Sequence, residues 1–471
     1  MSTMHLYQGA MASTTGLAVP RTSRRHLHLS DDPLVIVGYH LAGEPAAPVA
    51  MMWGRSATRP HMFVVPEPRE RSTRFEALSA FATELVAYMT AASDPQIVLA
   101  NPATASWLLK FVGRFTRYVR VDGATPAPVS IREAGGHLTF LHQEYMTPGS
   151  STVLTAVDAL TQHFRTGQMP SEDQNLAALL GWVRPGSGMT GLDAAMLAEA
   201  TDPPSGPMSD PSWDREVLEE ASELWRSAEG DADLQRHARR RLEDGARDAL
   251  DPGWNQVWTT LGIMSGLPEA ASVAHRRADD MRRFRDHRDR AAAGQMFFRI
   301  QPEASGSAWL LQRHERTDEQ LRAEMVLDDP LLMAAVLTDE PAISGTVIGV
   351  EPTHVERDTR QRRRPLLRIR LDLATYATES VDLYGVATPE LVVRVRNATD
   401  EIVEVVIVKG ANNATSEHRI PTVGSHVVFS PYRVREFRNG SSLRATPWTH
   451  TLPEIGDDTP GTARSLEVGH E

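Results

Sequence analysis

Residues 366–373 read LLRIRLDL and residues 391–396 read LVVRVR, two stretches in which apolar and charged side chains alternate. Side chains along a β-strand point alternately to its two faces, so this period predicts strands with one apolar and one arginine-bearing face. Three further β-prone stretches accompany them, at residues 343–350, 402–408 and 426–431. Five short strands with no long helix among them predict a small β-barrel or sandwich over residues 341–438.

The arginines of this barrel are the candidate nucleic-acid-binding residues. They are Arg368 and Arg370 on one strand, Arg394 and Arg396 on another, and Arg362, Arg363 and Arg364 in the loop before the first strand, where Arg357 and Arg360 also lie. Arginine is well suited to contact phosphates. If the two strands are neighbours, four arginines line one face.

The barrel resembles an oligonucleotide-binding barrel, which implies that its strand face and loops contact single strands. Base stacking would use aromatic residues, and Tyr376, Tyr384, Phe429 and Tyr432 are available. The alternative is an ordinary solvent-exposed face in an arginine-rich chain. Lys110 and Lys409 are the only lysines among 49 lysines and arginines, as a GC-rich genome would also produce.

Residues 34–185 are predicted to form an α/β domain. Short apolar runs at 34–39, 49–53, 61–65 and 96–100 predict strands, with a helix from Ser72 and another after Asn101. Residues 118–121, 129–132 and 137–142 are predicted as further strands, the last two joined as a hairpin across Gly135 and Gly136. Helices that begin at Ser151 and Ser171 are expected to complete the domain.

The element order of residues 34–183 resembles the ribonuclease H-like fold and the exonucleases built on it. That resemblance implies two metal ions held by carboxylates, beginning on the first strand. Residues 35–40 read VIVGYH and contain no acid, and Asn101 follows the fourth strand. The remaining candidate carboxylates are scattered: Glu44, Asp158, Glu172 and Asp173. We therefore expect no catalytic centre, no metal at His137, His142 and Glu144, and no cofactor.

The rest of the chain divides by composition. Residues 1–33 are predicted to be a disordered basic leader, 186–213 a linker rich in Pro, Gly and Ser, and 439–471 a disordered tail. Residues 214–340 are predicted to be a helical domain in which acidic residues outnumber basic ones. Seven arginines between residues 276 and 290 alternate with aspartates, which predicts a salt-bridged helix face.

The composition narrows the possible functions. The chain has no cysteine, which excludes disulfides, thiolate metal sites and cysteine nucleophiles. No apolar run is long enough to span a bilayer and no secretory signal is evident, so we expect a cytoplasmic protein without a membrane partner. The sequence predicts a multi-domain α+β protein that acts as a non-catalytic nucleic-acid-binding accessory subunit of a DNA- or RNA-handling assembly, with a protein partner. Alternatives are an adaptor that binds a protein through its helical middle, or a hydrolase with an unrecognised site.

Overall fold

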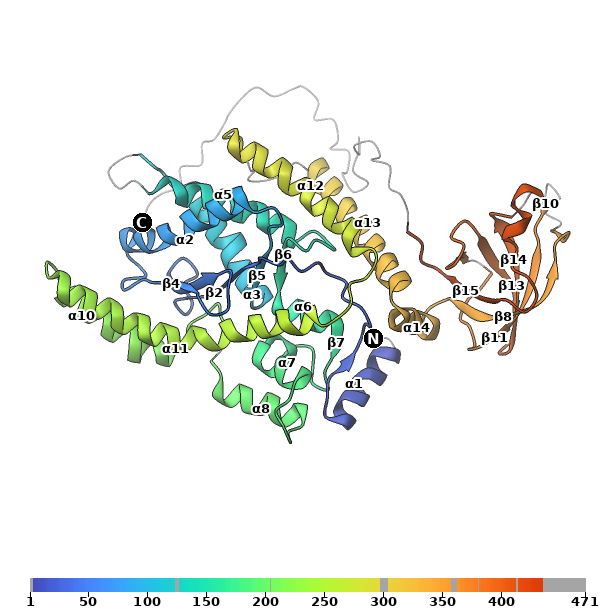
Figure 1. Ribbon diagram of the computed structural model, residues 1–471, viewed down its shortest axis with the longest axis horizontal. Coiled ribbons are helices and arrows are strands. Elements are labelled where there is room, and N and C mark those ends of the chain that lie inside the picture. Colours follow the sequence, from blue (N-terminus) through green and yellow to red (C-terminus); the bar gives the residue numbers. More distant parts are fainter. Residues whose placement is uncertain are drawn as a thin grey trace, which may run out of the picture.

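The computed structural model describes residues 3–122, 127–203, 205–296, 304–356, 362–379, 381–411 and 414–434 (Figure 1). Within them the chain is a mixed α/β structure with a helical middle and, toward the C-terminal side, a closed β-barrel. This coarse architecture agrees with the expectation from the sequence. The predicted tail at residues 439–471 lies outside the described residues.

A five-stranded sheet is the centre of the first part, with strand order β4-β3-β2-β5-β6. Its strands are β2 (Leu34–His40), β3 (Pro48–Gly54), β4 (His61–Val64), β5 (Ile97–Leu99) and β6 (Val153–Thr155). β2, β3 and β4 form an antiparallel meander, whereas β5 and β6 run parallel to β2. Every residue of β2 and β3 is buried, because helices cover both faces of the sheet.

Each face of the sheet has its own hydrophobic core. Leu34 and Ile36 point to a core formed with α2 (Arg71–Ala91), the helical segment η1 (Ser106–Val112) with α4 (Gly113–Thr116), and α5 (Val129–Tyr145). Val35 and Val37 point to a second core formed with α6 (Ala156–His163), α7 (Leu176–Val183) and α11 (Ala232–Ser265). Alternate residues of β2 therefore hold the two helical layers to one sheet.

The predicted hairpin at residues 129–142 is wrong, because this segment is the helix α5. Gly135 and Gly136 are not turn residues. A β-carbon at Gly135 would lie 2.3 Å from the backbone nitrogen of Arg117, so glycine is needed here for close packing of the chain after α4 against α5. The predicted strand at 118–121 is also absent. The helix predicted from Ser151 begins only at Ala156, since residues 153–155 form β6.

Residues 3–30, predicted to belong to a disordered leader, are ordered against the rest of the protein. They contain α1 (Thr3–Thr15) and β1 (Val19–Pro20), which pairs with β7 (Phe164–Arg165). The carboxylate of Asp329 accepts hydrogen bonds from the backbone nitrogens of Ser23 and Arg24 at 2.7 and 2.9 Å. We call residues 21–30 the N-terminal strap, because they join the sheet domain to the later helices.

The predicted linker at 186–213 is not one continuous loop. It contains α8 (Gly191–Thr201), which begins with a capping box between Thr190 and Asp193, and the short α9 (Pro211–Trp213). The capping box supplies the hydrogen bonds that the first turn of a helix otherwise lacks, so a helix forms despite the nearby Pro and Gly residues.

The helical middle comprises the helical segment η3 (Asp214–Glu219) and the helices α10 (Glu220–Ser227), α11, α12 (Val273–Ala292), α13 (Ala304–Asp328) and α14 (Pro330–Asp339). It shares the cores of the sheet. Leu242 and Leu250 of α11 belong to one core and Phe284 of α12 to the other. The hairpin formed by α10 and the first half of α11 projects beyond the sheet (Figure 1).

The barrel closes in the strand order β11-β14-β13-β12-β15-β8. Its strands are β8 (Ile343–Glu351), β11 (Leu366–Leu371), β12 (Asp382–Gly385), β13 (Val392–Ala398), β14 (Ile402–Lys409) and β15 (His426–Ser430). Sequence reasoning missed the four-residue β12, which closes the barrel between β13 and β15. A separate hairpin pairs β9 (Val355–Glu356) with β10 (Arg362–Arg363). The barrel lies to one side of the sheet, next to α14 (Figure 1).

Candidate nucleic-acid interface

The strand arginines lie on the outside of the barrel, as their alternation predicts. Leu367 and Ile369 of β11 and Val393 of β13 are fully buried in the barrel core. Arg368 and Arg370 lie between these positions on β11 and are exposed. Arg394 and Arg396 occupy the equivalent outer positions on β13, with Arg394 half-buried and Arg396 exposed.

The two arginine-bearing strands are not neighbours, because β14 lies between them. Adjacent strands are about 4.8 Å apart, so β11 and β13 are separated by roughly 10 Å. On β14, Glu404 is the cross-strand partner of Arg368, and Ile402 is the cross-strand partner of Arg370. We call the outer side of β11, β14 and β13 the arginine face. It carries four arginines, but the acidic residue Glu404 lies on β14, between the two strands that bear them.

Two of the four arginines are paired with carboxylates of adjacent strands. Arg368 Nε lies 3.0 Å from Glu404 Oε1. Arg394 donates through Nη2 and Nε to Asp382 Oδ1, at 2.6 and 3.0 Å. The Arg368 side chain is 56% exposed and that of Arg394 42%, so both ion pairs are in contact with solvent.

The other candidate arginines differ in their surroundings. Arg363 donates to Glu417 Oε1 at 2.8 Å and to the carbonyl of Pro352 at 2.7 Å. Arg396 Nη1 lies 3.4 Å from His354 Nε2. Arg364 follows β10, and its backbone nitrogen donates to the carbonyl of His354. Arg362 is in β10, and Arg357 and Arg360 lie outside the described residues.

The aromatic residues expected to stack bases are not on the arginine face. Phe429 is 1% exposed and belongs to the barrel core. Tyr384 lies on β12 beneath the guanidinium of Arg433, 4.4 Å from the ring centre. Tyr432 donates to Glu340 Oε2 at 2.7 Å, and Tyr376 is exposed in the segment after β11. The arginine face can therefore contact phosphates, but it offers no aromatic platform within its three strands.

The carboxyl ends of β2, β5 and β6 are the second candidate site, because ligands of open α/β sheets bind where the strand order reverses direction. His40 ends β2, and its ring is buried 5.4 Å from the ring of Trp107. Burial lowers the pKa of His40, although its hydrogen bond to the carbonyl of Leu41 opposes this. Asn101 after β5 caps α3 (Pro102–Ala105) by accepting from Thr104 N at 2.8 Å. Both residues serve the local fold.

The chain itself fills the space above these strand ends. The His40 backbone nitrogen donates to the carbonyl of Pro207 at 2.7 Å, and Ser209 N donates back to His40 at 3.0 Å. Asn101 Nδ2 donates to the carbonyl of Gly206 at 3.0 Å. A β-carbon at Gly206 would lie 2.7 Å from the carbonyl oxygen of Gly38, so this segment packs directly on β2.

The candidate carboxylates do not come together. Asp158 accepts from Tyr145 Oη at 3.0 Å and from Thr155 Oγ1 at 2.7 Å at the start of α6. Glu44 pairs with Arg69 at 2.6 Å. Glu172 accepts from Met169 N, and the buried Asp173 accepts from Thr166 Oγ1. Within the described residues, no group of three or more His, Asp or Glu side chains is placed to hold a metal ion.

The arginines of α12 dock this helix onto the rest of the protein. Arg276 pairs with Glu324 at 2.6 Å, and Arg277 with Asp94 at 2.6 Å. Arg283 pairs with the buried Glu144 at 2.9 Å as well as with Asp280 on its own helix. The sequence indicated the local partner Asp280, but it could not indicate partners from distant elements. Glu144, considered above beside His137 and His142, is one of these partners.

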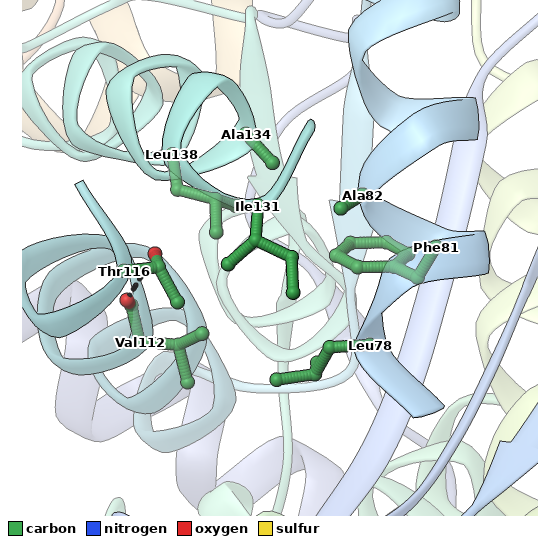
Figure 2. A pocket seen from close by; sticks show the side chains of 8 residues that line it. All are labelled: Leu78, Phe81, Ala82, Val112, Thr116, Ile131, Ala134 and Leu138. Carbon is green, nitrogen blue, oxygen red and sulfur yellow. Dashed lines mark hydrogen bonds between the residues drawn. The ribbon is translucent and has the colours of Figure 1, made fainter. Parts of the chain in front are cut away.

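The hollows in the described part of the chain are small or open. Figure 2 shows an apolar pocket lined by residues of α2, α4 and α5 and by Val112, with Phe81, Ile131 and Leu138 among them. Its volume is about 10 Å³. That volume is at the lower limit for one water molecule. A larger hollow of about 280 Å³ lies between α13 and residues 431–433 and is open to solvent.

No protein-family model matches this chain, and no curated protein or solved structure matches it either. Among the described residues, no helix is both long enough and apolar enough to cross a membrane.

Proposed function

We propose that this protein is a non-catalytic nucleic-acid-binding subunit of a DNA- or RNA-handling assembly, and that it binds through the arginine face of its barrel. The observation that carries the proposal is the placement of Arg368, Arg370, Arg394 and Arg396 on one outer surface above a closed apolar core. Because the core is complete without these side chains, they are available to a ligand.

The ion pairs on the face do not exclude a phosphate ligand. Exposed ion pairs are worth about 0–1 kcal/mol, so phosphate oxygens can compete with Glu404 and Asp382 for the guanidinium groups. Binding of this kind is weak and depends strongly on salt, because each phosphate contact releases counterions. Contact through phosphates also implies little dependence on base sequence.

The sheet domain supports the non-catalytic part of the proposal. An antiparallel meander followed by a helix, a parallel strand and a second helix supports descent from a ribonuclease H-like ancestor. In such a fold the carboxyl ends of the strands would hold the metal-binding acids, whereas here residues 206–209 cover His40 and Asn101. We propose that the domain is retained as a scaffold for the barrel.

The test is fluorescence anisotropy of the full-length protein with labelled single-stranded and duplex oligonucleotides between about 50 and 200 mM salt. Arg370→Ala with Arg396→Ala should weaken binding and flatten the plot of log affinity against log salt by roughly one to two units. The control is Arg282→Ala with Arg285→Ala on α12, two exposed arginines whose removal changes the net charge equally.

Two results would contradict the proposal. The first is no binding at low salt, and the second is an equal loss of affinity in the control pair. The same oligonucleotides incubated with magnesium or manganese should remain intact. Cleavage that Asp158→Ala abolishes would show that the protein is an enzyme.

An adaptor function is the second candidate, and one observation favours it. Trp309, Leu310 and Leu311 are consecutive on α13 and are 43%, 43% and 50% exposed. Neighbouring large apolar side chains on a surface are typical of protein contacts. If this function is correct, a protein partner should co-purify after nuclease treatment, and Trp309→Ser with Leu310→Ser should remove it.

A further inference from the structure

The acids on and beside the arginine face are placed to compete with a ligand for its arginines. Glu404 on β14 pairs with Arg368 on β11, and Asp382 on β12 pairs with Arg394 on β13. In each case the acid is the direct cross-strand partner of its arginine in the barrel register. The strand pairing itself therefore places each acid beside its arginine.

These acids change what the face can bind. A ligand with a single phosphate can gain one guanidinium contact at Arg370. At Arg368 or Arg394 it must displace a carboxylate that makes an equivalent contact. A nucleic-acid backbone offers many phosphates on one chain, so once one phosphate is held the next reaches its arginine at high effective concentration. The exchange of carboxylate for phosphate is then favourable only for the polymer.

We propose that Glu404 and Asp382 are specificity-determining residues of the arginine face: they act as built-in competitors that restrict it to ligands with closely spaced phosphates. The inference rests on the proposed function, since it concerns the same surface. Its ligand class is a nucleic-acid backbone, because a free mononucleotide can use only the single contact at Arg370 and should not bind measurably. Arg370 makes the first contact, because it is exposed and its cross-strand partners are Ile402 and Thr346 rather than an acid. The nearby Asp372 is held by Ser344 and His426.

The experiment replaces both acids by their amides in the full-length protein. Glu404→Gln with Asp382→Asn keeps the size of each side chain and one acceptor oxygen but removes its charge. Affinity for a labelled single-stranded 20-mer should rise about five- to tenfold, because two more arginines become free for phosphates. The plot of log affinity against log salt should steepen by roughly one to two units. Binding of a nucleoside monophosphate should become measurable at low salt.

The matched control is Asp286→Asn with Asp289→Asn, which changes the net charge by the same amount at exposed positions on α12, a helix that lies away from the barrel (Figure 1). Its affinity for the 20-mer should stay within about twofold of the natural protein, since charges beyond a Debye length are screened. The single variants Glu404→Gln and Asp382→Asn, with melting temperatures, show whether the barrel still folds.

The outcomes separate this inference from the proposed function. If the natural protein binds and the amide pair binds no tighter, the inference is overturned while the proposed function stands. If the control pair gains as much as the amide pair, the effect is net charge alone and the inference is again overturned. If only the amide pair binds, the acids block the face instead of selecting a ligand, and both proposals fall. Failure of both proteins to bind rejects both proposals.

Discussion

Acidification from pH 7 to pH 5 should destabilise the protein through a pair of buried histidines. His137 of α5 and His287 of α12 share a hydrogen bond of 2.9 Å between Nδ1 and Nε2. They are 4% and 3% exposed, and the His287 ring stacks on Phe140 at 3.9 Å. Burial lowers the pKa of His137 to about 4. Burial, with His137 and Arg290 nearby, lowers the pKa of His287 to about 3.

The sign and size of the effect follow from these values. A histidine in the unfolded chain has a pKa near 6.5. Below that pH the two histidines bind protons in the unfolded state but remain neutral in the folded state. The free energy of unfolding is therefore at its full value with respect to this pair above about pH 6.5, and it falls as the pH drops toward 4. Each histidine accounts for about 2 kcal/mol lost between pH 7 and pH 5, and the pair for about 4 kcal/mol.

Urea unfolding at a series of pH values measures this loss directly. The variant His137→Gln with His287→Gln keeps a donor and an acceptor but cannot titrate, so its free energy of unfolding should vary less by about 4 kcal/mol over this range. A control, His237→Gln on the exposed side of α11, should follow the natural protein. Parallel curves for the natural protein and the double variant would refute the reasoning.

Two further predictions concern packing and order. Gly135→Ala should cost about 1–3 kcal/mol in the free energy of unfolding, because its β-carbon would meet the Arg117 backbone. By contrast, Gly262→Ala on α11 has open space around it and should stabilise by up to about 1 kcal/mol, so equal effects in thermal unfolding would contradict the packing argument. Within residues 186–213, limited proteolysis followed by mass spectrometry should show cuts at 186–190 and none at 191–201, since α8 is capped. Early cuts inside α8 would mean that this helix is not stable.

The sequence predicted the elements whose patterns are local. The alternation in residues 366–371 and 392–396 was enough to place Leu367 inside the barrel and Arg368 outside it. The runs at 34–39 and 49–53 likewise became the central strands β2 and β3. In each case the pattern is repeated over several residues, so a single ambiguous side chain does not change the interpretation.

The errors came from residues whose role depends on a distant element. Gly135 and Gly136 have the composition of a turn, and only the approach of Arg117 to Gly135 and of Met296 to Gly136 shows that they are packing residues. The order of strands in the barrel is also not local, so nothing in the sequence placed β14 and Glu404 between the arginine strands. The ion pair of the buried Glu144 could not be predicted either, because its partner Arg283 is 139 residues away.

The N-terminal strap sets an order of events during synthesis. Ser23 and Arg24 of the strap are held by Asp329, and Thr3 and Met4 at the start of α1 are held by Asp339, across separations of 305 to 336 residues. At about 5–20 residues per second, a ribosome needs on the order of 15 to 60 s to translate from the strap to these acids. His26, which is completely buried in the finished fold, must meanwhile remain exposed. The growing chain therefore exposes the strap, including His26, until α14 has been synthesised. A truncated product that ends before residue 329 exposes it permanently.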